Sequence, residues 1–171
     1  MLEVLAPFNA PARLLHVAAG VMLIAGLVGR WTTLAHAERA ARASDISAVQ
    51  ALLRTSHVFE KMVIISSQIV IVLGLLTAWG MGYPILGFLQ GNTTNWLLVS
   101  LVLYASIIGL VPTVFVPKGR RFEAALQQSI KVGQPTPALV SAFADRVVRG
   151  AHIYEVGIVG VVLALMVLKP F

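Results

Sequence analysis

The last apolar stretch of the chain reads Ala151-His-Ile-Tyr-Glu-Val-Gly-Ile-Val-Gly-Val-Val-Leu-Ala-Leu-Met-Val-Leu-Lys169. A helix of this length and hydrophobicity can cross the roughly 30 Å hydrocarbon core of a bilayer. Glu155 lies inside the stretch, and a carboxylate at the centre of a membrane helix costs about 2.5–3.5 kcal/mol on insertion scales. His152 and Arg149 precede Glu155 at intervals of three residues, so the three side chains share one helix stripe. The stretch therefore predicts a membrane helix whose polar groups need a partner or a purpose.

The composition is typical of a polytopic membrane protein. Of the 171 residues, 58% are hydrophobic and only 12% are charged, which is more apolar surface than a soluble domain of this size needs. There is no cysteine, which excludes disulfides, thiolate metal sites and iron–sulfur clusters. The formal charge is +6, but most basic residues flank apolar segments. We therefore expect the lipid bilayer, and no nucleic acid, as the partner of these charges.

Four apolar segments are long enough to span a bilayer. They cover approximately residues 12–34, 58–81, 96–116 and 149–167. Within the third segment Pro112 predicts a kink, and Pro117 predicts the end of the helix. Gly20 in the first segment predicts the close approach of another helix or of a flat ligand. The sequence thus predicts an all-α fold, a single transmembrane domain over residues 1–171 that forms an integral membrane four-helix bundle.

The polar connections predict the orientation of the bundle. Residues 35–56 and 118–148 contain short amphipathic helices; one begins after Asp45 and runs into the second segment, and another begins with Thr136 as its cap. Eleven of the thirteen basic residues fall on the side of these two connections: Arg30, Arg39, Arg42, Arg54, Lys61, Lys118, Arg120, Arg121, Lys131, Arg146 and Arg149. The positive-inside rule then puts both connections in the cytoplasm and both termini outside, and we expect the chain in the cell inner (plasma) membrane.

The histidines are the first candidates for binding a cofactor. A helix bundle can hold a haem between histidines on facing helices. His16 and His152 lie inside apolar segments and are the candidate metal ligands, while His57 with His152 is a conceivable pair near the inner end of the bundle. For His36 and His57 the alternative interpretation is that they are interfacial residues, which contact headgroups or water. The residues predicted to bind a cofactor are His16, Arg30, His57, Lys61, His152 and Glu155.

Charged residues near the inner half of the bundle allow two interpretations. Arg30, Glu60, Lys61, Arg149, His152 and Glu155 carry opposite signs and can form a purely structural salt-bridge network. A site for protons, for an anionic ligand or for a porphyrin propionate would use the same residue types. Ser66, Ser67 and Gln68 add polar groups near the middle of the second segment, where helix–helix hydrogen bonds are expected. The sequence has no nucleotide-binding glycine loop, no serine-hydrolase elbow and no His-Glu-x-x-His motif.

Several motifs resemble one bacterial family over nearly the whole chain. They are Leu15-His16, Gly74-Leu-Leu-Thr-Ala-Trp before Gly82-Tyr-Pro, Asn95-Trp-Leu-Leu-Val-Ser-Leu-Val-Leu-Tyr, and Leu165-Met-Val-Leu-Lys-Pro. In these motifs the chain resembles the uncharacterised integral membrane family called domain of unknown function 2269. The name of that family implies no activity.

A looser resemblance is to the HemJ-type protoporphyrinogen oxidases and the copper-resistance D membrane proteins. It rests on His16, Ala25-Gly26-Leu27, Arg30, His36-Ala37-Glu38, Tyr154-Glu155-Val156 and Val167-Leu-Lys-Pro-Phe171. The resemblance implies a four-helix fold, His16 as a haem or porphyrin ligand and Glu155 as an active-site carboxylate. That family opens its third helix with Trp-Leu-His-Val-Lys, whereas this chain has Leu98 and Ser100 in place of the histidine and the lysine.

Three hypotheses of function follow. The first is a membrane protein associated with haem b or a porphyrin, with a redox role. The second is a non-catalytic accessory subunit, which associates with other membrane subunits or with copies of itself. The third is a small proton-coupled transporter that uses Glu155 and Gln68, although the chain has no inverted repeat. The sequence assigns no catalytic residue and leaves open whether the protein is an enzyme.

Overall fold

The computed structural model describes the backbone of residues 2–170 and the side chains of residues 10–170. Over this range the chain is helical and contains no strand. Four helices are long and apolar enough to cross a membrane, over Ala10–Arg42, Ile46–Gly80, Trp96–Val132 and Pro137–Leu168. The predicted class, an all-α bundle of four membrane helices, is confirmed.

The first two helices form a long antiparallel hairpin. Helix α1 covers Leu2–Arg42 and helix α2 covers Ile46–Gly80. The carboxylate of Asp45 caps α2 by accepting a hydrogen bond of 2.9 Å from the backbone N–H of Ala48. The helix start predicted at this position is therefore confirmed. Helix α1 continues past the predicted end of its apolar segment at 34, because polar residues mark the limit of the apolar segment and not the limit of the helix. Helix α2 runs without a break from Ile46 into the apolar segment that begins at 58, as predicted.

Glycine allows α1 and α2 to pack closely, but at a different position from the predicted one. A Cβ atom added to Gly26 would lie 2.9 Å from Cγ2 of Val63 and 3.3 Å from the carbonyl oxygen of Phe59. A Cβ atom added to Gly20 would meet nothing within 4 Å. The close approach expected at Gly20 therefore occurs at Gly26, six residues or about one and two-thirds turns further along the helix.

The third span is a single rod with a π-helical turn in it. Helix α3 covers Trp96–Leu110, the π-helix η2 covers Val111–Phe115, and helix α4 covers Val116–Val132. The disturbance predicted at Pro112 is present as this π-turn. The helix end predicted at Pro117 is wrong, because Pro117 lies in the first turn of α4, where a missing backbone N–H is tolerated.

The remaining elements are short except for the last helix. The 3-10 helix η1 covers Gly87–Gln90, α5 covers Pro137–Phe143 and α6 covers Arg146–Leu168. The Thr136 hydroxyl caps α5 at the backbone N–H of Leu139, as the sequence predicted. Asp145 caps α6 through the backbone N–H groups of Val147 and Val148.

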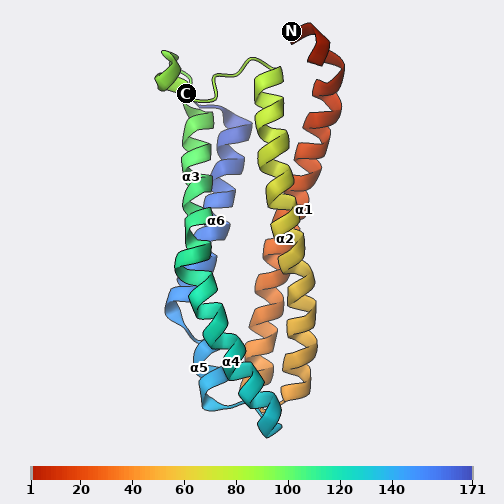
Figure 1. Ribbon diagram of the computed structural model, residues 1–171, viewed down its shortest axis with the longest axis vertical. Coiled ribbons are helices and arrows are strands. Elements are labelled where there is room, and N and C mark those ends of the chain that lie inside the picture. The colour runs from red at the N-terminus through yellow and green to blue at the C-terminus, as the bar shows by residue number, and fades with distance from the viewer. Residues whose placement is uncertain (1, 171) are drawn as a thin grey trace.

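The four long helices are arranged as two pairs (Figure 1). Helices α1 and α2 lie side by side, and α3 lies beside α6. Both termini and η1 lie at one end of the bundle, and α4, α5 and the α1–α2 turn lie at the opposite end. We call the latter the basic end, since it contains Arg39, Arg42, Arg54, Arg120, Arg121, Lys131 and Arg146. Its apolar core joins α1, α2, α4 and α5 through Ala37, Val49, Leu53, Leu126 and Leu139.

Candidate functional site

A cleft of about 1230 Å³ opens between the two helix pairs. Its inner part, near the middle of the bundle, is lined by the apolar side chains of Leu23, Leu27, Val63, Ile107 and Val159. Its mouth, at the basic end, is lined by charged and titratable side chains, namely Glu38, His57, Glu60, Lys118, Arg121, Glu123, Asp145 and Arg149. The wall of the cleft therefore changes from apolar to charged along the bundle axis.

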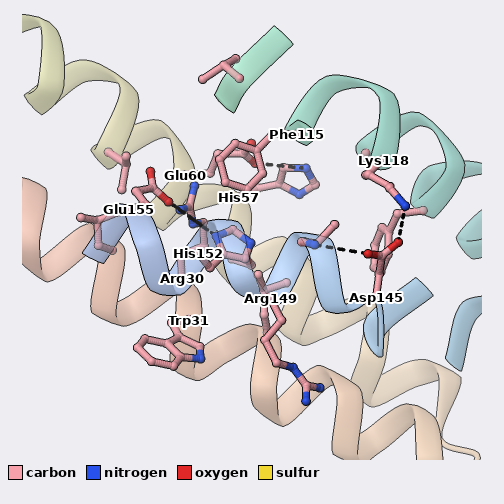
Figure 2. Close-up of a pocket in the computed structure, with 18 of the residues that line it drawn as sticks. Arg30, Trp31, His57, Glu60, Phe115, Lys118, Asp145, Arg149, His152 and Glu155 are labelled. Atoms are coloured by element: carbon pink, nitrogen blue, oxygen red, sulfur yellow. Dashed lines mark hydrogen bonds and ion pairs between the residues drawn. The ribbon is translucent and has the colours of Figure 1, made fainter. Parts of the chain in front are cut away.

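Arg30, His152 and Glu155 meet on the wall of the cleft (Figure 2). The guanidinium of Arg30 on α1 forms an ion pair with the Glu155 carboxylate on α6, and both side chains are largely buried, with 14% and 9% of their surface exposed. Nη2 of Arg30 also lies 3.2 Å from Nδ1 of His152 and donates a hydrogen bond to it. The membrane-depth carboxylate thus has a buried partner of opposite charge, as such groups require.

An aromatic ring covers this cluster from the third span. The ring of Phe115 lies with its centroid 4.9 Å from that of His152. The guanidinium carbon of Arg30 lies 5.9 Å from the centroid of the same ring, within the range of a cation–π contact. Phe115 is the last residue of the π-turn, so η2 sets the position of this ring over the charged pair.

The mouth of the cleft is held by weaker, more exposed pairs. Nζ of Lys118 lies 2.6 Å from Asp145, which connects α4 to the start of α6. Arg149 lies 3.3 Å from Glu38, which connects α6 to α1. The guanidinium of Arg121 has no ion pair with any side chain in residues 10–170. Exposed pairs of this kind contribute little stability, so their basic members can exchange partners.

The structure brings together only part of the predicted set. Arg30, His152 and Glu155 are in contact, and His57 lines the mouth of the cleft, 3.9 Å from Glu60. Lys61 is exposed and does not line the cleft, which suits a lysine that reaches toward the headgroups.

His16 lies apart from the cleft. Its Nδ1 is 2.9 Å from the carbonyl oxygen of Val70, and its ring packs where a Cβ on Gly74 would be. It precedes Arg30 by fourteen residues, which is about 21 Å along a helix. Because Arg30 contacts His152, one metal ion cannot be bound by both His16 and His152.

The polar residues near the middle of α2 behave differently from expectation. The hydroxyls of Ser66 and Ser67 donate to carbonyl oxygens of their own helix, at Met62 and Ile64. Gln68 lines the inner part of the cleft, and its amide has no hydrogen-bond partner among the side chains and backbone of residues 10–170. The helix–helix bond at this level comes instead from Tyr104 on α3, whose hydroxyl donates to the carbonyl oxygen of Ser67 at 3.0 Å.

Sequence reasoning missed the members of the site that have no charge pattern of their own. Phe115 and Tyr104 lie in a uniformly apolar segment, where the sequence gives no signal for them. Asp145 was detectable, because an aspartate immediately before an apolar run is a typical helix N-cap. No group of three or more His, Asp or Glu side chains is placed to hold a metal ion within the described residues.

Comparison with known proteins gives one match. Residues 11–170 match the family described as "Predicted integral membrane protein (DUF2269)". No curated protein and no solved structure matches the chain.

Proposed function

The chain belongs to this family of integral membrane proteins, and we propose that it binds an amphipathic carboxylic acid in the cleft. The observation that carries the proposal is the order of the lining, apolar near the middle of the bundle and charged at the basic end. Ligand sites are mostly apolar with a few polar groups that fix the orientation of the ligand. A molecule with an apolar body and a charged head matches this order, with its head at the mouth.

Three basic side chains at the mouth can pair with an acidic head, although four carboxylates line the mouth as well. Arg121 lines the mouth without an ion pair in the described part of the chain, and Lys118 and Arg149 are held only by partly exposed partners. Basic residues outnumber acidic ones over the basic end as a whole, through residues outside the mouth, and such a field raises the local concentration of anions. The acid would pair with these three cations, at the level of the lipid headgroups.

The buried Arg30–Glu155 pair has a supporting role in this proposal. It connects α1 to α6 on the wall of the cleft and keeps the two helix pairs in register. The Arg30–Glu155 pair is more buried than the pairs at the mouth. An incoming acid would therefore form its ion pairs with the cations at the mouth, because Arg30 would have to leave a buried partner.

Haem b is the second candidate ligand, and its support is that His57 and His152 both line the cleft. A porphyrin is an amphipathic dicarboxylic acid, so Lys118, Arg121 and Arg149 suit its propionates. His57 suits the iron better than His152. Nδ1 of His152 lies 3.2 Å from Arg30 and 3.5 Å from the Glu155 carboxylate, so its ring is already in contact with the buried ion pair. Bound haem would supply one-electron redox chemistry.

The test of the first proposal uses Trp31, which lines the cleft. Parinaric acid, a fluorescent fatty acid, accepts energy from tryptophan and would be titrated into the protein in lipid nanodiscs. We expect saturable energy transfer that falls most strongly in Trp31→Phe, since the other two tryptophans, Trp79 and Trp96, lie at the opposite end of the bundle. Combining Lys118→Gln with Arg149→Gln should weaken binding about tenfold or more, since charge-assisted contacts are lost. Arg54→Gln is the matched control, because Arg54 is exposed and outside the cleft. Transfer that rises linearly with added acid, equally in all variants, would reject the proposal.

The haem candidate needs a separate measurement. Purified protein reconstituted with haem would be examined for a Soret band, with His57→Ala and His152→Ala alongside. A band that shifts in His57→Ala supports iron ligation by His57. A reconstituted preparation without a Soret band rejects haem and leaves the acid-binding proposal to its own test.

A further inference from the structure

We infer that the ligand of the cleft carries a hydrogen-bonding group, such as a hydroxyl, in the distal half of its apolar body, and that Gln68 recognises it. This inference rests on the proposed function, because it describes the ligand of the same cleft. The observation is the amide of Gln68, an exposed side chain that lines the cleft beside Ser67 and Tyr104 and has no hydrogen-bond partner among residues 10–170. An amide near the middle of a membrane segment is costly when its hydrogen bonds are unmade.

Gln68 lies at the inner part of the cleft, far from the mouth. The residues of α2 that line the cleft run from Leu53 near the mouth to Gln68. Gln68 follows Leu53 by fifteen positions, which is about 22 Å along a helix. A ligand with its acid at the mouth therefore reaches Gln68 only with the distal half of a long chain.

Tyr104 adds a second polar atom at the same level. Its hydroxyl donates to the carbonyl oxygen of Ser67, the neighbour of Gln68, and Tyr104 also lines the cleft. Because that proton is engaged, the phenol oxygen is left as an acceptor. The Gln68 amide offers both a donor and an acceptor. A ligand hydroxyl suits this pair, since it can accept from Gln68 and donate to Tyr104.

The other polar groups near the middle of α2 form no hydrogen bond with the amide of Gln68. The hydroxyls of Ser66 and Ser67 are both bonded to carbonyl oxygens of α2. The nearest charged lining residues on the same helix, Glu60 and His57, lie eight and eleven residues closer to the mouth, about 12 and 16 Å along the axis. The partner of the amide is therefore expected to come from the ligand.

Displacement of parinaric acid by three fatty acids tests the inference. They are stearic acid and stearic acid with a hydroxyl on its twelfth or on its second carbon. The measured quantity is the affinity for the acid with the hydroxyl on its twelfth carbon divided by the affinity for stearic acid. We expect this ratio to be about threefold to tenfold higher in wild-type protein than in Gln68→Leu. Gln68→Met, which nearly preserves volume, should lose the same preference. Gln128→Leu, at an exposed glutamine outside the cleft, is the matched control and should keep it.

The acid with the hydroxyl on its second carbon controls for the general effect of adding a polar group to the ligand. Its affinity relative to stearic acid should be the same in wild type and in Gln68→Leu. The inference is overturned if the two Gln68 variants keep the preference of the wild type. It is also overturned if they change the oligomeric state in nanodiscs, which would make a second copy of the chain the partner of the amide. Failure of all three acids to displace parinaric acid would instead reject the proposed function.

Discussion

Arg30 and Glu155 explain how a carboxylate is kept inside the last membrane helix. The ion pair connects two helices that are distant in sequence, and His152 and Phe115 enclose it. Both side chains are largely buried, so a charge left alone by removal of its partner stays poorly solvated. The pair is therefore costly to break from one side, although replacing both members together need not be.

The ion pair makes a prediction for a double-mutant cycle. Arg30→Gln and Glu155→Gln should each lower the free energy of unfolding by about 3–5 kcal/mol, because each leaves an uncompensated buried charge. The double variant should lose less than either single variant. Reversible unfolding in detergent micelles measures all three, with Arg42→Gln as a control at an exposed pair. Additive losses in the double variant would contradict a direct buried pair.

His16 is predicted to stabilise the α1–α2 hairpin and to take no part in ligand binding. Its ring bonds to the backbone at Val70 and fills the space above Gly74. Gly74→Ala should lower stability by about 1–3 kcal/mol, because its Cβ would lie 2.9 Å from Cε1 of His16. His16→Ala should also lower the melting temperature and leave the parinaric acid titration unchanged. Loss of binding in a folded His16→Ala protein would show that His16 belongs to the site.

Helices α1 and α2 pack closely because residue 26 is a glycine. Gly26→Ala is expected to cost about 1–3 kcal/mol, since its Cβ would press on the backbone of Phe59 and on Val63, and backbone cannot move aside. Gly20→Ala on the same helix should be neutral, or stabilising by up to about 1 kcal/mol, because the new methyl group meets nothing. Chemical unfolding of the two variants compares them directly. Equal effects at the two glycines would contradict the close packing of α1 against α2 at Gly26.

The cap of α2 makes a prediction about pH. The backbone N–H of Ala48, and then the hydroxyl of Ser47, hold the pKa of Asp45 below its usual value. A carboxyl whose pKa is lowered by folding contributes stability above its unfolded pKa of about 3.9, and this contribution is lost as the pH falls through the folded pKa. Asp45→Asn keeps an acceptor that does not titrate. Its melting temperature should therefore fall less than that of wild type below about pH 4, and parallel curves would contradict the cap.

The orientation of the whole bundle can be tested because the chain has no cysteine. Gln90 lies at the end with the termini, and Ser44 lies in the turn at the basic end. The positive-inside rule predicts that Gln90→Cys reacts with a membrane-impermeant maleimide added to intact cells. Ser44→Cys should react only after permeabilisation. The reverse labelling pattern would place the mouth of the cleft outside the cell.

The sequence predicts the helices of this fold better than it predicts their ends or their contacts. Apolar length is a local property, so the four spans follow from it, and the caps at Asp45 and Thr136 follow from equally local chemistry. Helix continuation through Pro117 does not follow from the sequence, because a proline can end a helix or lie in the first turn of one, and here it lies in the first turn of α4, directly after the π-turn.

The candidate site was predictable only in its charged part. Charge type selected Arg30 and Glu155 as members of a larger set, whereas their pairing depends on how α6 is rotated against α1. Nothing in the sequence distinguishes Phe115 and Tyr104 from other residues of their apolar segment, and only the fold shows that they line the cleft. The same holds for Gln68, whose lack of a partner is visible only in three dimensions.

The central claim is that the cleft is the binding site, and plugging it is the most direct test. Ile107→Cys places a thiol on the cleft wall, and Val102→Cys places one on the exposed side of the same helix. Each would be alkylated to completion with a bulky maleimide before the parinaric acid titration. Alkylation at residue 107 should abolish the saturable energy transfer from Trp31, and alkylation at residue 102 should leave it intact. Saturable transfer that survives complete alkylation at residue 107 would contradict the claim.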